Sequence, residues 1–172
     1  MQPPELRFTT PQTLKELSDC YEEFKFLQHF SPLKLTEEEF QEVLVDSLQF
    51  ATLVHVNGVL FGCFLYDVFN DSVELHGIVR ADAKTIFAGL GQIKKTIYNA
   101  ILEDIFNVMG RAKVVLKAKP DNVGVRGFAI LYGFKRLPYM DKGRVVWVLH
   151  RRDYNGKRET KKDESCNSNV SV

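Results

Sequence analysis

The stretch DNVGVRGFAILYGF, residues 121–134, decides how the rest of the chain is interpreted. Its apolar residues recur at helical spacing, and it closes on Gly133, the residue type that most often caps a helix end in the left-handed conformation. A strand-like segment, KVVLKA, comes before it, and two alternating segments follow it. The stretch is therefore predicted to be a helix that connects strands.

The segments on either side indicate an α/β chain whose sheet is mixed and mainly antiparallel. Asn57-Gly58 is a strong hairpin signal, and Thr36 and Glu39 have the spacing of a capping box at the start of a helix. The expected order is β-α-α-β-β-β-α-β-α-β-β, with a β-α-β crossover and a parallel strand pair between residues 73 and 113. We expect helices over 10–30, 36–48, some or all of 82–109, and 121–133, and strands at 5–9, 50–56, 59–69, 73–79, 113–118, 134–137 and 144–150.

The composition fits one globular domain, because 45% of the 172 residues are apolar and the net charge is +1. We expect a single domain over 1–151 and a polar, disordered tail over 152–172. The balanced charge gives no reason to expect a nucleic-acid partner. The three cysteines are scattered without a CxxC pair, so neither a disulfide framework nor a metal site is expected. No signal pattern or long apolar run is present, which favours a cytoplasmic protein without a membrane partner.

The spacing within the opening stretch resembles the GNAT superfamily, the GCN5-related N-acetyltransferases. Asn122 is followed three residues later by Val125, six later by Phe128, and then by Gly133-Phe134, as is common after the fifth strand of that family. The resemblance covers nearly the whole body of the chain, about residues 6–151. It implies the acyl-CoA N-acyltransferase fold and acetyl-coenzyme A as cofactor, without a metal. It also implies that Asn122 and Phe128 lie on the adenine side of the cofactor.

The loop that binds the pyrophosphate in GNAT enzymes is altered in this sequence, RADAKTIFAGLGQIKK. Counted from the fourth strand, Lys84 takes the Arg/Gln position and Gly89 the last glycine, with Phe87 where the first glycine belongs. Counted by the glycines, Gly89 and Gly91 fit, but Ile86 replaces the Arg/Gln and the loop is longer. In both cases the resemblance implies that the segment binds pyrophosphate through backbone N–H groups.

A third interpretation of the same segment is a helix that begins at an Asp82 N-cap and continues through both glycines, because Ile86, Leu90 and Ile93 keep helical spacing. The surviving phosphate cradle would then be the N–H groups near residues 83–85, with Lys84 and Arg80 as cations. These alternatives differ in whether 87–91 is loop or helix. The adjoining Ile78 and Val79, at the end of the fourth strand, are expected beside the pantetheine.

The general acid of many GNAT enzymes, a tyrosine four residues before the Gly-Phe glycine, is replaced here by Ala129. One feature favours chemistry: His76 and Glu74 lie on the same face of the fourth strand by alternation. A histidine of ordinary basicity suits a general base at neutral pH, so His76 and Glu74 are the candidate catalytic residues. The alternative is a core histidine hydrogen-bonded to its neighbour.

Two functions of different classes follow from the resemblance. The first is an acetyl-CoA-dependent N-acetyltransferase whose partner is an amine acceptor, either a small molecule or a protein. The second is a non-catalytic GNAT-fold protein of bacteriophage head assembly, with phage structural proteins as partners in the host cytoplasm or the virion. It rests on similarity to phage-type members, in which a histidine on the fourth strand precedes a degenerate glycine loop and alanine replaces the helix tyrosine.

Overall fold

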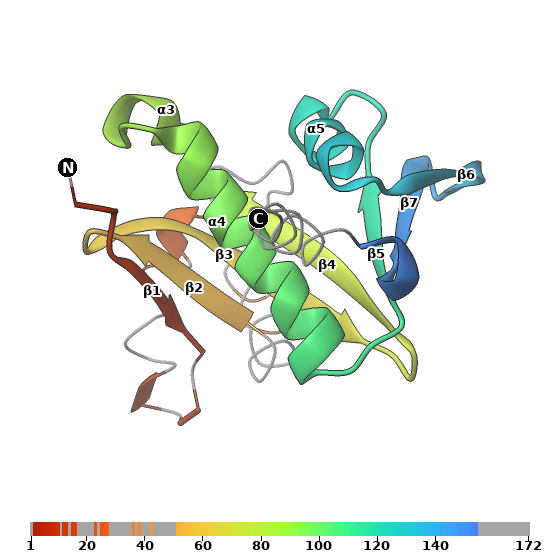
Figure 1. The fold of residues 1–172 in the computed structure, drawn as a ribbon, viewed down its shortest axis with the longest axis horizontal. Coiled ribbons are helices and arrows are strands. Elements are labelled where there is room, and N and C mark those ends of the chain that lie inside the picture. The colour runs from red at the N-terminus through yellow and green to blue at the C-terminus, as the bar shows by residue number, and fades with distance from the viewer. Residues whose placement is uncertain are drawn as a thin grey trace, which may run out of the picture. The chain divides into compact units, whose positions relative to one another are not determined.

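The computed structural model describes residues 2–10 and 51–154, and between them residues 12, 13, 15, 16, 23, 25–27, 36, 38 and 42. The chain forms two compact units. One comprises Met1–Phe69 and Val73–Ala100, and the other comprises Asn70–Ser72 and Ile101–Val172. Seven strands with flanking helices give the predicted α/β fold (Figure 1).

The first unit contains four antiparallel strands in chain order. The β2–β3 hairpin turns at Asn57 and Gly58, whose φ angles of 50° and 77° are both positive. This backbone is the one that an Asn-Gly turn favours, so the predicted hairpin is confirmed. The strands are β1 (Leu6–Thr9), β2 (Ala51–Val56), β3 (Val59–Val68) and β4 (Ser72–Val79).

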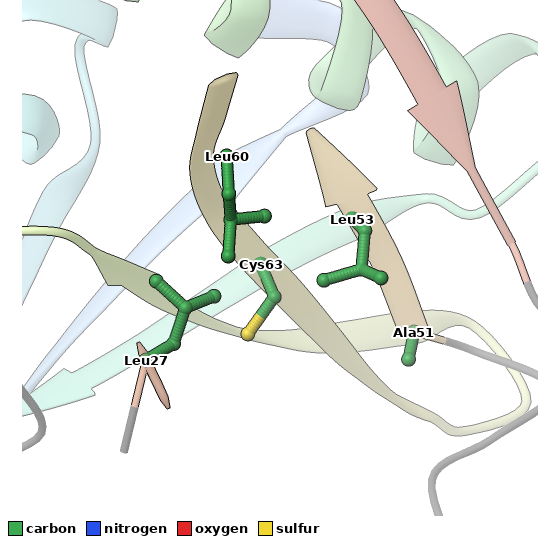
Figure 2. Packing of buried hydrophobic residues seen from close by; sticks show 5 residues of the cluster. All are labelled: Leu27, Ala51, Leu53, Leu60 and Cys63. Atoms are coloured by element: carbon green, nitrogen blue, oxygen red, sulfur yellow. The ribbon is translucent and has the colours of Figure 1, made fainter. Parts of the chain in front are cut away.

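A register shift between Val54 and His55 brings two β3 residues that are three positions apart onto one face of these strands. Leu53 is paired with Cys63 and His55 with Leu60, so Leu60 and Cys63 point to the same side despite their odd spacing. Figure 2 shows Leu60 and Cys63 beside Leu53, Ala51 and Leu27, the last from the helical residues 25–27. This apolar cluster is almost fully buried.

The opposite face of the first unit is covered by the helix α4 (Leu90–Glu103), which lies across β2–β4 in Figure 1. Ile93 and Ile97 are buried on its inner side, and the ring of Tyr98 meets that of Phe64 edge to face at 6.0 Å. A single turn of helix, α3 (Ala83–Ile86), precedes α4, and a π-helical segment, Asp104–Val108, follows it.

The second unit contains three antiparallel strands and one helix. β7 (Arg144–His150) pairs with both β5 (Lys113–Ala118) and β6 (Lys135–Asp141). The helix α5 (Val123–Tyr132) lies between β5 and β6 in the chain. A 3-10 turn, Arg151–Asp153, ends this part, and the ring of Tyr154 packs against Phe106 with centroids 5.2 Å apart.

Local sequence signals determine both ends of α5. Asn122 is the N-cap residue, and its side-chain oxygen accepts a hydrogen bond from the Val125 N–H at 3.1 Å. Gly133 ends the helix with φ 77°, and the N–H of Phe134 donates to the carbonyl of Ala129 at 2.9 Å. These are the bonds of a glycine-capped helix end, so the helix predicted from the opening stretch is confirmed.

Most of the other predicted elements are confirmed with small shifts, and β6 extends further than the predicted strand at 134–137. The predicted helices over 10–30 and 36–48 lie largely outside the described residues. Of the described residues within them, 15, 16, 23, 25–27, 38 and 42 are helical, and 10, 12, 13 and 36 are not. The single domain over 1–151, the tail over 152–172 and the parallel pair of the crossover stay predictions. No helix among the described residues is long and apolar enough to span a membrane.

Candidate functional site

His76 lies on β4 and faces two carboxylates. Its Nε2 atom is 3.0 Å from Oδ2 of Asp67 and 3.5 Å from Oε1 of Glu74. The strand register explains this proximity, because Asp67 of β3 is directly opposite Glu74, and Leu65 is opposite His76. All three polar side chains therefore stand on one face of the β3–β4 hairpin. The expected juxtaposition of His76 and Glu74 is confirmed, and Asp67 is an addition that the sequence analysis did not contain.

The three groups differ in their exposure to solvent. The side chain of Glu74 is 11% exposed, that of His76 is 34% exposed, and that of Asp67 is 53% exposed. A buried carboxylate requires a polar or charged neighbour, and the imidazole supplies one to Glu74. The partly exposed ring of His76 is in reach of a molecule that approaches from solvent, as a proton acceptor must be.

The same groups also have the donor types of a metal site. One ligand atom from each of Asp67, Glu74 and His76 lies within 4.8 Å of the other two. The atoms that approach most closely, Nε2 of His76 and Oδ2 of Asp67, form a hydrogen bond, which accounts for their distance without a cation. The sequence-based expectation of no metal therefore stays a prediction.

Ile78 and Val79 continue β4 beyond the histidine. Ile78 packs against the apolar cluster around Leu27, and both residues are partly buried. Gly62 of β3 faces Val79, and the backbones of the two strands approach closely there. The strand then leaves the ladder at Arg80, whose N–H donates to the carbonyl of Phe61 at 3.1 Å. Whether Ile78 and Val79 contact a cofactor stays a prediction.

The segment after β4 is neither one continuous helix nor a plain loop. Helix α3 ends at Ile86; its C-cap residue, Phe87, is extended with φ −106° and ψ 115°, and Gly89 has φ 68°. Helix α4 starts immediately afterwards, so Gly91 lies in its first turn. The side chain of Phe87 is buried, and its ring centroid is 5.8 Å from that of Phe61. The third interpretation, in which one helix runs through both glycines, is wrong, because Phe87 packs inward and Gly89 takes a left-handed conformation.

Two of the three N–H groups in the expected cradle near residues 83–85 are already hydrogen-bonded. The N–H of Ala83 donates to the carbonyl of Arg80 at 3.2 Å, and that of Thr85 donates to the carbonyl of Asp82 at 2.9 Å. In the described part of the chain, the N–H groups of Leu90, Gly91 and Gln92 have no acceptor, since the first bond of α4 is from Ile93 to Gly89. Three consecutive free donors therefore stand at the start of α4.

The charge of Arg80, one of the two expected cations, is already neutralised. Its guanidinium donates to both carboxylate oxygens of Asp82, at 2.7 and 3.1 Å, and to the carbonyl of Leu60 at 3.0 Å. The hydrogen bond from Arg80 holds the pKa of Asp82 below its usual value. Lys84, by contrast, is exposed and forms no ion pair with any described residue. Lys84 is therefore the better candidate for contact with an anion.

The predicted cofactor residues of α5 have local structural roles. Asn122 caps the helix, as described above. The ring of Phe128 packs between those of Tyr132 and Phe134, with centroids 4.9 and 5.6 Å away. Ala129 is fully buried, so the position of the family's acid tyrosine faces the interior. Contact of Asn122 or Phe128 with a cofactor stays a prediction.

No family model matches the chain, and no curated protein matches its sequence. Solved structures do match. Mutant forms of the spermidine/spermine N-acetyltransferase SpeG from Vibrio cholerae are 14% identical with a TM-score of 0.66, covering 89% of this chain and 98% of that one. A GNAT-family acetyltransferase from Bacillus anthracis is 14% identical with a TM-score of 0.59, covering 87% and 98%. The chain is similar to these proteins in fold.

A third similar structure was solved with a ligand. The N-acetyltransferase PseH from Campylobacter jejuni, in complex with acetyl coenzyme A, is 15% identical with a TM-score of 0.53, covering 87% of this chain and 99% of that one. Each alignment spans nearly the whole of the similar protein. The chain therefore has the GNAT acetyltransferase fold that the spacing around Asn122 implied.

Proposed function

We propose that the chain is an acetyl-CoA-dependent N-acetyltransferase in which His76 is the general base. The observation that supports this most is the contact of His76 with two carboxylates, Asp67 of β3 and Glu74 of β4, in a fold shared with N-acetyltransferases. Acetyl-coenzyme A, when bound, supplies an activated acetyl thioester for attack by an amine. The imidazole accepts the proton that the amine nitrogen loses as it forms the new C–N bond.

The residues present fit an anionic cofactor at the start of α4. The three N–H groups of Leu90, Gly91 and Gln92 have no protein acceptor among the described residues, and the positive end of the helix dipole adds to their attraction for phosphate. A Cβ added to Gly91 would meet no atom within 4 Å, so a ligand can approach its backbone closely. Lys84, which lies in the preceding helix α3, would add a positive charge.

The carboxylates of Asp67 and Glu74 stabilise the imidazolium that His76 becomes when it accepts a proton. Their negative charge also favours the approach of a protonated amine. No tyrosine stands at Ala129 to protonate the departing thiolate. The thiolate of coenzyme A is a fair leaving group, so protonation by solvent suffices at a reduced rate.

The first test is a calorimetric titration of the protein with acetyl-coenzyme A. Saturable binding is expected, and it should weaken in Lys84→Ala but not in Lys95→Ala, which removes the same charge from an exposed position on α4. Transfer is then followed by release of the free thiol with a panel of amines. A protein that binds no acetyl-coenzyme A at millimolar concentration would contradict the proposal.

The phage-type branch and the assembly role expected from the sequence stay an alternative. They rest on the altered glycine loop and on Ala129. No observation in the fold or in the similar structures favours them over acetyl transfer. If neither acetyl-coenzyme A nor coenzyme A bound, a search for a protein partner would be the next step.

A further inference from the structure

We propose that Asp67 is the positioning residue of His76. Its carboxylate accepts the Nε2–H of the imidazole and thereby leaves Nδ1 as the nitrogen that takes the proton of the acceptor amine. This inference rests on the proposed N-acetyltransferase function. The hydrogen-bond partner of His76 is then Asp67, whereas the sequence alone indicated Glu74.

The distances from Nε2 of His76 distinguish the roles of the two carboxylates. Oδ2 of Asp67 is 3.0 Å from Nε2 and forms a hydrogen bond, whereas Oε1 of Glu74 is 3.5 Å from the same nitrogen and makes only an ion-pair contact. An ionised carboxylate has only acceptor atoms, so the hydrogen that lies between Asp67 and His76 belongs to Nε2. In the neutral ring the other nitrogen, Nδ1, then carries the free lone pair.

The backbone holds this arrangement in place. Asp67 and His76 lie on paired strands, diagonally across the β3–β4 hairpin, with Glu74 and Leu65 as their direct partners. Diagonal side chains on one face of an antiparallel pair are within reach of each other. Groups carried by regular strands are held more exactly than groups on loops, which is the condition that a base and its orienting residue must meet.

The Asp67 carboxylate has two effects on His76. It prevents rotation of the ring, and it stabilises the positive charge that appears when Nδ1 is protonated. Loss of the Asp67 carboxylate should therefore slow the chemical step and leave cofactor binding intact.

Steady-state kinetics of five variants test this. Asp67→Ala should lower kcat by about tenfold or more, the effect typical of a lost orienting partner, with KM for acetyl-coenzyme A unchanged. Asp67→Glu should restore part of the rate. Asp71→Ala, an exposed carboxylate at the turn of the same hairpin, should be unchanged. In a His76→Ala background, Asp67→Ala should cause no further loss.

Two kinetic results would overturn the inference. One is an equal loss of rate from Asp67→Ala with and without His76, which would show that Asp67 does not act through the imidazole. The other is a rise in KM for the amine with kcat unchanged, which would make Asp67 a substrate contact. Thermal unfolding of each variant shows that the fold is retained.

A second measurement does not depend on activity. Nitrogen-15 NMR of labelled histidine at a pH where the ring is neutral should show Nε2 protonated and Nδ1 unprotonated for His76, with the other tautomer appearing in Asp67→Ala. A protonated Nδ1 in the wild type would contradict the assignment, and so would a change of the His76 signals on EDTA treatment, which would show a metal on Nε2. If acetyl transfer is absent but this spectrum is found, the proposed function fails and the pairing of Asp67 with His76 stands.

Discussion

Gly62 and the carbonyl oxygen of Ile78 approach each other so closely that a Cβ added to Gly62 would lie 2.5 Å from that oxygen. The Cα atom of Gly62 and the carbonyl oxygen of Ile78 belong to the backbones of two paired strands, so neither can move aside without distorting the hydrogen bonds between the strands. Overpacking of this kind costs about 1–3 kcal/mol and occasionally more. We expect Gly62→Ala to destabilise the protein by about 3 kcal/mol, measured by urea unfolding. An unchanged unfolding midpoint would show that β3 and β4 are further apart.

Gly89 and Gly91, two residues apart, should respond in opposite ways to alanine. Gly89 has φ 68°, so Gly89→Ala should cost about 1–2 kcal/mol of unfolding free energy. Gly91 lies in the first turn of α4, where alanine is a better helix former and its Cβ meets open space. Gly91→Ala should therefore leave stability unchanged or higher and weaken acetyl-coenzyme A binding in calorimetry. Unchanged affinity in Gly91→Ala would place the pyrophosphate elsewhere.

Asn122 allows its structural and binding roles to be separated. Asn122→Ala removes the hydrogen bond to the Val125 N–H and should cost about 1 kcal/mol. Asn122→Asp keeps the cap, since an aspartate oxygen accepts the same bond, but it adds a negative charge. If Asn122 lies beside the cofactor, Asn122→Asp should retain the thermal midpoint and bind acetyl-coenzyme A more weakly. Equal binding by Asn122→Asp and wild type would leave Asn122 as a helix cap only.

Because the thiol of Cys63 is buried, we expect the free energy of unfolding to fall at alkaline pH. Burial raises the pKa of Cys63 from its ordinary value of 9.0 to about 12. A raised pKa means that the folded state favours the protonated thiol, so this stabilisation is complete below about pH 9 and is lost as the pH rises toward about 12. Cys63→Ala should flatten the alkaline part of a plot of unfolding free energy against pH relative to wild type. An identical slope in both proteins would contradict this.

The low reactivity of the same thiol offers a check by mass spectrometry. The thiolate is the reactive form, and Cys63 is almost fully buried among Leu27, Leu53 and Leu60. Iodoacetamide at pH 8 should leave the Cys63 peptide unmodified in the folded protein and modify it in urea. Rapid labelling without denaturant would show that the cluster opens readily.

Elements whose ends are marked locally were predictable from the sequence. Asn57-Gly58, Asn122 and Gly133 each act through their own backbone conformation or through a neighbour three to five residues away. Such short-range effects leave a readable pattern, and the strands Lys113–Ala118 and Arg144–His150 have the predicted bounds. The comparisons with solved structures agree with the fold that these signals indicated.

The break between α3 and α4 was not predictable in the same way. Ile86, Leu90 and Ile93 keep helical spacing through it, although Ile86 is exposed and Ile93 is buried. What interrupts the helix is the burial of Phe87 against Phe61, a contact between residues far apart in the sequence. Tertiary packing of this kind overrides a local periodicity.

Asp67 was missed because its contact depends on strand register. A turn at residues 70–71 pairs Val68 with Val73, and Asp67 then stands opposite Glu74. The alternation of side chains along a strand predicts that Glu74 and His76 share a face, but it does not show which residues of the neighbouring strand lie beside them. Counting back from the expected turn would have placed Asp67 beside the histidine.

The most direct test of acetyl transfer at His76 is the rate of thiol release from acetyl-coenzyme A, with an amine acceptor present, in wild type and His76→Ala. We expect equal binding of acetyl-coenzyme A by the two proteins and a rate lower by about 10²–10⁴ in the variant, the usual contribution of a general base. Equal rates in the two proteins would contradict the role of His76, and the absence of amine-dependent release from wild type with every acceptor would contradict acetyl transfer itself.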